Sequence, residues 1–275
     1  MAPLAQEGYS LFVFPFSLYS IMTRYTFTLG RAGLPQETSS LDINLKLVNL
    51  HRDENLAEDY LLNINPKGQV PALTGNDLPT PLTDSLDISY WLCNHFPGLL
   101  PEAHKPVIQQ FLTQLHGFEG LSLSVPSKAD RQEGVPNPSL DALLARSDIT
   151  PEYKRALEYK KKFHQETQEP ALWEENVERA ERLAKSVFDR VLRIHSWPQH
   201  TSGPWIFGEA ATVLDAHLVP LVARLLDCGR TDLVPDELQE YALAAMRGPE
   251  YQAVTHGRRT IWDVSLGHVG LMKDF

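Results

Sequence analysis

Predicted strands and helices alternate along the first 98 residues, and this order constrains the fold more than any other feature of the chain. A short apolar run from Tyr9 to Phe14 predicts a buried strand, and the period-two alternation over residues 41–47 predicts a second strand. Between them, residues 20–29 carry apolar side chains on one helical face, with Ser20 as the predicted N-cap. Alternation of this kind is typical of a sheet that contains parallel strands.

The remainder of this region adds an antiparallel edge to the predicted sheet. Residues 56–64 predict a short helix or turn, and residues 71–74 and 80–83 predict two short strands that follow one another. A helix is predicted over 85–95. The complete order, β-α-β-α-β-β-α, predicts an α/β domain with a thioredoxin-like topology and a mixed four-stranded sheet.

The chain after this region is predicted to be helical. Residues 97–101, Pro-Gly-Leu-Leu-Pro, are typical of a linker, so we expect an N-terminal domain over 1–98 and an all-helical domain over 103–275. The helix over 213–226 is apolar nearly all round, which predicts a buried position at the centre of the second domain. Further helices are predicted over 107–121, 151–168 and from Trp173 to Ile194.

Thr212 and Asp215 predict how the central helix begins. Thr212 is the expected N-cap, and Asp215 is expected to return a hydrogen bond to the backbone amide of Thr212, which is an acidic form of the capping box. Loss of this cap is expected to cost about 0.5–2 kcal/mol of stability. We interpret both residues as structural.

The charge of the chain argues against two classes of partner. The formal net charge is -10 and the pI is about 5.5, whereas nucleic acids and anionic membrane surfaces are bound by basic faces. The sequence has no basic, apolar leader at its start and no run of 18 apolar residues. Only two cysteines occur, Cys93 and Cys228, which favours a reducing compartment. We therefore expect a cytoplasmic protein with no nucleic-acid or membrane partner, and the histidine spacing predicts no metal site.

One motif in the predicted sheet points to a ligand. Residues 65–73 are Asn-Pro-Lys-Gly-Gln-Val-Pro-Ala-Leu, so Pro71 opens a strand in which proline cannot donate a ladder hydrogen bond. A cis bond before Pro71 would turn the Val70 backbone toward a ligand. Eleven residues after this motif, Asp84 and Ser85 begin an apolar helix, and a helix start favours anions. A backbone clamp beside an anion site suits a small peptide with a free carboxylate.

These residues, in this order, resemble the cytosolic glutathione transferases along nearly the whole chain. The C-terminal part of the resemblance is Gly208 followed by 212–215, which is similar to the buried capping box of that family. The segments 49–66 and 257–263 are most similar to fungal glutathione-transferase-like proteins, several of which act in secondary metabolism. The resemblance implies an enzyme that transfers alkyl or aryl groups, with glutathione as co-substrate, no metal and a homodimeric assembly.

The resemblance also implies roles for individual residues. Val70 is expected to pair its backbone with the cysteinyl part of glutathione, in the manner of an added strand. Ser85 is expected to hold the γ-glutamyl carboxylate and Asp84 to face the γ-glutamyl ammonium. Gln69 resembles the residue near the cysteinyl and glycyl end. The glycyl carboxylate of the family usually meets a basic residue, and here an ungapped comparison puts Asn55 at that position.

Thiol activation requires a hydrogen-bond donor near the start of the first helix. A thiol has a pKa of about 8.5, and lowering it by two units takes about 2.7 kcal/mol of thiolate stabilisation. The donor is expected between Phe14 and Arg24, where three residues qualify, Ser17, Tyr19 and Ser20. Ser20 is our first choice because the helix dipole acts only within the first turn, and Ser17 is the second. Tyr19 is interpreted as a substrate-site residue.

The second substrate is expected between the two domains, against Tyr19, Phe111 and His116. The reaction implied is attack of glutathione thiolate on a hydrophobic electrophile, by conjugation, isomerisation or ether cleavage, with a secondary-metabolite intermediate as the expected substrate. The segment 122–170 is longer than a minimal helical domain requires, and either covers the site or extends the dimer face. The alternative function is a non-catalytic glutathione-binding carrier or regulator, which the missing basic residue and the elongated loop before the first helix favour.

Overall fold

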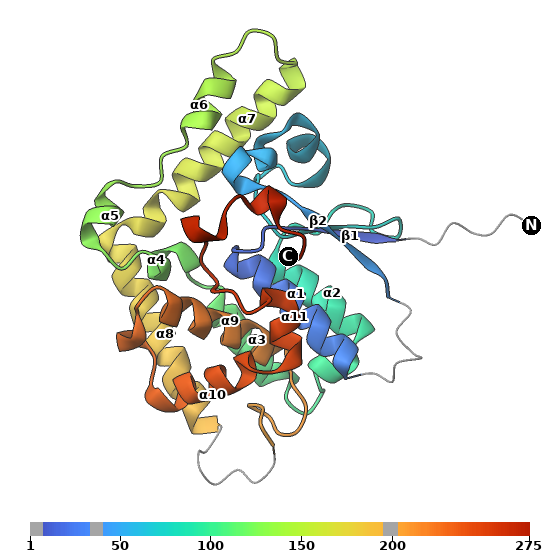
Figure 1. Ribbon diagram of the computed structural model, residues 1–275, viewed down its shortest axis with the longest axis vertical. Helices are drawn as coiled ribbons and strands as arrows, with labels where there is room; N and C mark the ends of the chain where they lie inside the picture. Colours follow the sequence, from blue (N-terminus) through green and yellow to red (C-terminus); the bar gives the residue numbers. More distant parts are fainter. Residues whose placement is uncertain (1–7, 34–40, 195–202) are drawn as a thin grey trace, which may run out of the picture.

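The computed structural model describes residues 8–33, 41–194 and 203–275, and its N-terminal part has the predicted thioredoxin-like topology (Figure 1). The central strand β1 (Tyr9–Val13) pairs in parallel with β2 (Ile43–Leu47) and antiparallel with β3 (Ala72–Thr74). The strand order is therefore β2-β1-β3. This mixed sheet and the crossover through the first helix confirm the predicted fold class.

The described sheet has three strands, so the prediction of four was wrong. The expected strand over 80–83 is reduced to one bridge, in which Leu73 and Leu82 exchange backbone hydrogen bonds of 2.8 and 2.9 Å. Pro79 and Pro81 both precede Leu82 in the segment that was expected to form the strand or to lie beside it. Because neither proline has an N–H to donate, the ladder cannot extend along this segment.

The first helix, α1 (Leu18–Ala32), begins earlier than predicted. Its N-cap is Ser17 and not Ser20, because the Ser17 hydroxyl accepts a hydrogen bond from the Ser20 amide at 3.3 Å. Ser17 and Ser20 are both suitable N-cap residues by sequence, and only the backbone geometry shows which of them is the N-cap. The earlier start places Tyr19 and Ser20 inside the first turn.

Helices make up most of the remaining chain, as predicted. The first helix packs against α2 (Ser85–His95), α9 (Val213–Asp227) and α11 (Pro249–Thr255). Helix α9 is buried from Val213 to Leu225, which confirms its predicted central position. Ring contacts such as Tyr25 with Tyr251, 5.2 Å between centroids, join the first helix to the C-terminal helices. The predicted division at 98–103 stays a prediction.

The predicted helix over 107–121 is interrupted. Helix α3 (Lys105–Leu115) ends before a turn, and α4 (Gly120–Ser124) starts after it. The amide of Gly117 donates to the Gln114 carbonyl at 3.1 Å, which closes this turn. The interruption matters for the site, because it presents residues 116–119 beside the N-terminal part of the chain.

The segment 122–170 forms a helical extension against the N-terminal part. It contains α5 (Lys128–Gln132), α6 (Pro138–Leu144) and α7 (Pro151–Phe163), of which α6 and α7 project at the top of Figure 1. Helix α7 contacts the π-helical turn Tyr60–Ile64, and the Tyr153 hydroxyl donates to the Leu56 carbonyl at 2.7 Å. The predicted short helix or turn over 56–64 is therefore covered by this extension.

The C-terminal part also contains α8 (Glu174–Ile194) and α10 (Asp236–Met246). Within the described ranges, no helix combines the length and the apolar character that a membrane crossing requires. Cys93 is buried in α2, and burial raises the pKa of its thiol to about 12, so this cysteine is inert as a nucleophile.

Asp215 accepts more hydrogen bonds than a capping box requires. One carboxylate oxygen accepts from the amide and the hydroxyl of Thr212, each at 2.7 Å. The other accepts from the Ile206 amide at 3.1 Å and from the hydroxyl of Tyr241. Asp215 is fully buried, so this carboxylate ties the 206–212 loop, the start of α9 and helix α10 to one point.

Candidate functional site

A cavity of about 230 Å³ lies where the predicted ligand motif meets the turn after α3. The motif contributes Gln69, Val70 and Pro71, and the start of α2 contributes Asp84 and Ser85. The opposite wall comes from the C-terminal part of the chain, through His116, Phe118, Glu119, Phe163 and Thr167. Tyr19, Lys67 and Thr83 complete the lining. Because α7 and the turn after it supply part of this wall, the 122–170 extension adjoins the cavity.

Side chains that do not line the cavity hold the backbone of the motif in place. The Val70–Pro71 peptide bond is cis, as predicted. The carbonyl of Gln69 accepts hydrogen bonds from the Tyr60 hydroxyl at 2.7 Å and from the Asn65 side-chain amide at 2.9 Å. These two side chains fix the backbone that precedes Val70.

Asn55 belongs to this support and does not line the cavity. Its side-chain amide donates to the carbonyl of Gly68 at 2.8 Å. Gly68 has a φ of 56°, in the left-handed region that glycine adopts readily. The structure thus brings Asn55 close to the motif, in a place where it stabilises the turn at Gly68.

The start of α2 has the geometry of an anion site. Asp84 is the N-cap, and its carboxylate accepts from the amides of Leu86 at 2.8 Å and Asp87 at 3.4 Å. Ser85, the first helical residue, is buried and lines the cavity. The positive end of the helix dipole therefore faces the cavity beside one exposed carboxylate.

The three candidate hydroxyls have different surroundings. Ser20 is fully buried, and its hydroxyl accepts from the amide of Phe14 at 3.3 Å. Ser17 is half-buried at the N-cap position. The loop that carries it is anchored by Arg224 of α9, whose guanidinium donates to the Phe16 carbonyl at 2.7 Å. Of the three, only Tyr19 is among the residues that line the cavity.

Tyr19 joins the first helix to the wall opposite it. Its hydroxyl accepts from the amide of Gly120 at 3.0 Å, and its ring lies 5.8 Å from that of His116. Burial, with a further contribution from Glu119, raises the pKa of Tyr19, so the phenol stays protonated at neutral pH. Tyr19 and His116 therefore both line the cavity, and their role in substrate binding stays a prediction.

Phe111, the third predicted substrate residue, lies in the core of the protein. It is fully buried, and the Arg190 guanidinium lies 4.7 Å from its ring centroid. Phe118, seven residues further along the chain, lies in the turn after α3 and lines the cavity instead. The uninterrupted helix expected over 107–121 gave no reason to separate the two phenylalanines.

Lys67 is a site residue that we did not single out in the sequence. It lines the cavity, and its ammonium lies 5.8 Å from the Phe163 ring centroid. Lys160 lies on the same ring at 5.7 Å, and burial lowers its pKa to about 8. The signal was present, because Lys67 is the basic residue inside the 65–73 motif.

The cavity carries both signs of charge. Burial and the neighbouring Asp84 raise the pKa of Glu119, while Lys67 opposes this shift. A ligand with a carboxylate and an ammonium group would find a partner for each. Among the residues described, no group of three histidine, cysteine or acidic side chains has the arrangement of a metal site.

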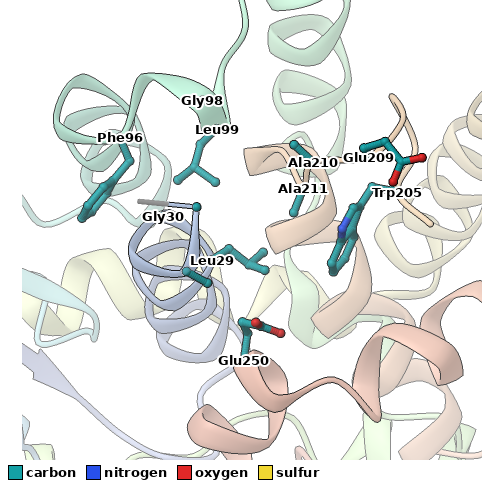
Figure 2. Close-up of a pocket in the computed structure, with 12 residues that line it drawn as sticks. Leu29, Gly30, Phe96, Gly98, Leu99, Trp205, Glu209, Ala210, Ala211 and Glu250 are labelled. Atoms are coloured by element: carbon teal, nitrogen blue, oxygen red, sulfur yellow. The ribbon is translucent and has the colours of Figure 1, made fainter. Parts of the chain in front are cut away.

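A second cavity lies at the other end of α1 (Figure 2). Its volume is about 320 Å³, and Leu29, Phe96, Leu99 and Trp205 give it an apolar lining, with Glu209 and Glu250 at its edge. A helix of this length separates its two ends by about 20 Å. This cavity is therefore distinct from the one that contains the motif.

Comparisons with known proteins agree with the fold. Residues 11–100 match the family model described as "Glutathione S-transferase, N-terminal domain". A sequence search of curated proteins found no match. Among solved structures, the beta-etherase LigF from Sphingobium sp. strain SYK-6 is similar with a TM-score of 0.61 and 15% identity, over 91% of this chain and 99% of that one.

Two further solved structures are similar in fold with lower TM-scores. A bacterial maleyl pyruvate isomerase of the zeta class has a TM-score of 0.51 and 19% identity, over 89% of this chain and 95% of that one. A glutathione transferase homologue from Sulfitobacter, with bound glutathione, has a TM-score of 0.52 and 17% identity, over 90% and 97%. The chain therefore has the fold of glutathione transferases, with a thioredoxin-like N-terminal domain and a mostly helical remainder.

Proposed function

We propose that this protein is a glutathione transferase that activates the glutathione thiol for attack on a hydrophobic electrophile. The observation that carries the proposal is the cavity itself, which brings the Val70 backbone and the start of α2 at Asp84 and Ser85 to one lining. We assign Val70 to the cysteinyl backbone, Ser85 to the γ-glutamyl carboxylate and Asp84 to the γ-glutamyl ammonium. The aromatic residues Tyr19 and Phe118 support an apolar second substrate on the opposite wall.

The reaction class is proposed from the solved structures that are similar in fold. A beta-etherase and a maleyl pyruvate isomerase are both similar in fold, which supports ether cleavage and isomerisation as candidates beside conjugation. The segments 49–66 and 257–263 support a substrate from secondary metabolism. A homodimer is part of the proposal, and light scattering that gives the mass of a single chain would contradict it.

The thiol-activating hydroxyl in this proposal is that of Ser17. Its N-cap position and partial exposure favour it over Ser20, whose hydroxyl is fully buried. The Ser17 oxygen accepts from the Ser20 amide, so its own hydrogen remains free to be donated to a sulfur. The helix dipole supports the same thiolate, because Ser17 stands at the positive end of α1.

We expect turnover when the protein is given glutathione and a chloronitroaromatic electrophile, measured by the absorbance of the thioether product. The rate should saturate in both substrates, because both bind before the reaction. Binding of glutathione without turnover on chloronitroaromatics, quinones and epoxides would instead favour the carrier. Burial of Phe14 and Phe16 against Val269 favours that second function, since it packs the loop before Ser17 against the C-terminal segment.

Lys67 is proposed to meet the glycyl carboxylate, in place of Asn55. The Lys67→Gln variant should bind glutathione about ten-fold more weakly, which corresponds to about 1.4 kcal/mol and is close to the lower end of the range of about 1.5–3 kcal/mol for a hydrogen bond to a charged group. Glutathione esterified at its glycyl carboxylate should bind the variant and the wild type equally. Calorimetric titration measures both ligands. An equal loss for the ester would show that Lys67 does not contact this carboxylate.

A further inference from the structure

A chain of buried hydrogen bonds leads from the start of α2 to His116 in the cavity wall. The Ser89 hydroxyl donates to the Ser85 carbonyl at 2.8 Å. The Ser89 oxygen lies 2.8 Å from Nε2 of His217. Nδ1 of His217 lies 2.9 Å from Nε2 of His116. This series of hydrogen bonds connects α2, α9 and the end of α3. None of the residue roles in the proposed function involves it.

The donor and acceptor of each hydrogen bond determine which ring nitrogen of His217 and of His116 carries a hydrogen. Ser89 has one hydroxyl hydrogen, which is donated to Ser85, so the Ser89 oxygen accepts from Nε2–H of His217. Thr26, 3.5 Å from Ser89, donates its own hydrogen to the Met22 carbonyl and does not alter this assignment.

A neutral imidazole carries one hydrogen. Nδ1 of His217 is therefore an acceptor, and Nε2–H of His116 is its donor. Nδ1 of His116 then carries a lone pair and no hydrogen. No hydrogen-bond partner for this atom lies within residues 8–33, 41–194 and 203–275.

Both imidazoles are neutral at physiological pH. His217 is fully buried, and burial lowers its pKa well below the usual value. Burial also lowers the pKa of His116, while the charge of Asp84 opposes this shift. The titratable and charged groups that face His116 from the surrounding elements are Tyr19, Lys67, Asp84, Glu119 and His217.

We propose that His116 is the proton acceptor of this site, and that its Nδ1 takes the proton of the glutathione thiol. The S–H bond breaks with its electron pair left on sulfur, and an N–H bond forms on Nδ1. The thiolate and the imidazolium together carry no net charge, and the proton passes to solvent after the thiolate has reacted. The carboxylate of Asp84 stabilises the imidazolium, because its charge opposes the lowering of the His116 pKa by burial. His217 and Ser89 are positioning residues, because they fix the tautomer of His116. This inference rests on the proposed glutathione function.

The variant His116→Gln tests the acceptor directly. Glutamine keeps an N–H donor near the position of Nε2, toward His217, and removes the lone pair of Nδ1. The measurement is the pH dependence of kcat/KM with glutathione and a chloronitroaromatic. In the wild type the rate should persist to below pH 6.5 and then fall as His116 becomes protonated. The variant should lose about 30-fold at pH 7, which is the factor by which the protonated thiol exceeds the thiolate at a pKa of about 8.5, and it should recover as the pH approaches that pKa.

The variant Ser89→Ala tests the tautomer without a change at His116. Without the Ser89 oxygen, Nε2–H of His217 loses its acceptor, so His217 can carry its hydrogen on Nδ1 and donate it to Nε2 of His116. The hydrogen of His116 then lies on Nδ1, which no longer has a lone pair to accept a proton. The pH profile should shift to alkaline values, as in His116→Gln. The matched control is Ser122→Ala, at an equally buried serine whose hydroxyl donates to the Ala171 carbonyl at 2.7 Å. This control should keep the wild-type profile.

Calorimetric titration with glutathione distinguishes a failure of the proposed function from a failure of the role of His116. If the wild type does not bind glutathione, the proposed function fails and this inference fails with it. If the wild type binds and turns over glutathione while His116→Gln keeps the wild-type rate and pH profile, only the role of His116 is overturned. An alkaline shift in His116→Gln and Ser89→Ala, absent from Ser122→Ala, supports it.

Discussion

Replacing Ser17 by alanine is expected to lower kcat/KM for glutathione and an electrophile about 100-fold. The variant lacks one hydrogen-bond donor to the developing thiolate. In other enzymes, removal of one donor to a developing anion costs about 2.7–4 kcal/mol. Binding of glutathione should change much less, because the γ-glutamyl contacts at Asp84 and Ser85 remain. The effect should therefore appear mainly in kcat, measured by steady-state kinetics at saturating glutathione.

Two further variants make this expectation specific to the Ser17 hydroxyl. Ser17→Ala also removes the N-cap of α1, at a cost of about 0.5–2 kcal/mol in stability. Ser17→Thr keeps both the cap and the hydroxyl, and should retain most of the rate. Ser20→Ala removes the acceptor of the Phe14 amide and should affect stability more than turnover. A large loss of kcat in Ser20→Ala, with Ser17→Ala nearly normal, would reverse the assignment.

Replacing Asp215 by alanine is expected to lower the free energy of unfolding by about 3 kcal/mol or more. Each buried donor that loses its acceptor costs about 1–3 kcal/mol. Asp215 accepts four hydrogen bonds, from Ile206, Tyr241 and two groups of Thr212. The expected loss therefore exceeds the 0.5–2 kcal/mol of an ordinary cap. Chemical denaturation monitored by circular dichroism measures it.

The control for this variant is Asp236→Ala, at an exposed acidic residue in the first turn of α10. That change should remain within about 0.5 kcal/mol of the wild type, as exposed substitutions usually do. If Asp215→Ala cost less than about 1 kcal/mol, the carboxylate would not be the point that ties the loop and the two helices together.

Local patterns predicted the order of elements and the ligand motif of this chain. The period of two in β2 and the apolar stripe of α1 are properties of neighbouring residues, so they can be read without tertiary contacts. The helix start at Asp84 follows from the strong preference of aspartate for the N-cap position. The cis bond before Pro71 was predicted from the position of a proline at the start of a strand. The prediction of a fourth strand over 80–83 was wrong because Pro79 and Pro81 have no N–H to donate to a sheet ladder.

Contacts between distant residues could not be predicted in this way. His116 and His217 are 101 residues apart, and His217 lies in an apolar helix with no local sign of a partner. The interruption after α3, which places Phe118 in the cavity and leaves Phe111 in the core, also depends on packing. The 122–170 extension left two interpretations open, and its contact with the cavity through Phe163 and Thr167 favours the one in which it covers the site.

The binding of glutathione to the cavity is the central claim, and calorimetric titration tests it most directly. We expect the wild type to bind one glutathione per chain at millimolar or lower concentration. Asp84→Ala should weaken this binding at least ten-fold, or about 1.4 kcal/mol. Asp87→Ala, at an exposed acidic residue in the same helical turn that does not line the cavity, should not. No heat of binding at millimolar glutathione, or equal binding by wild type and Asp84→Ala, would contradict the claim.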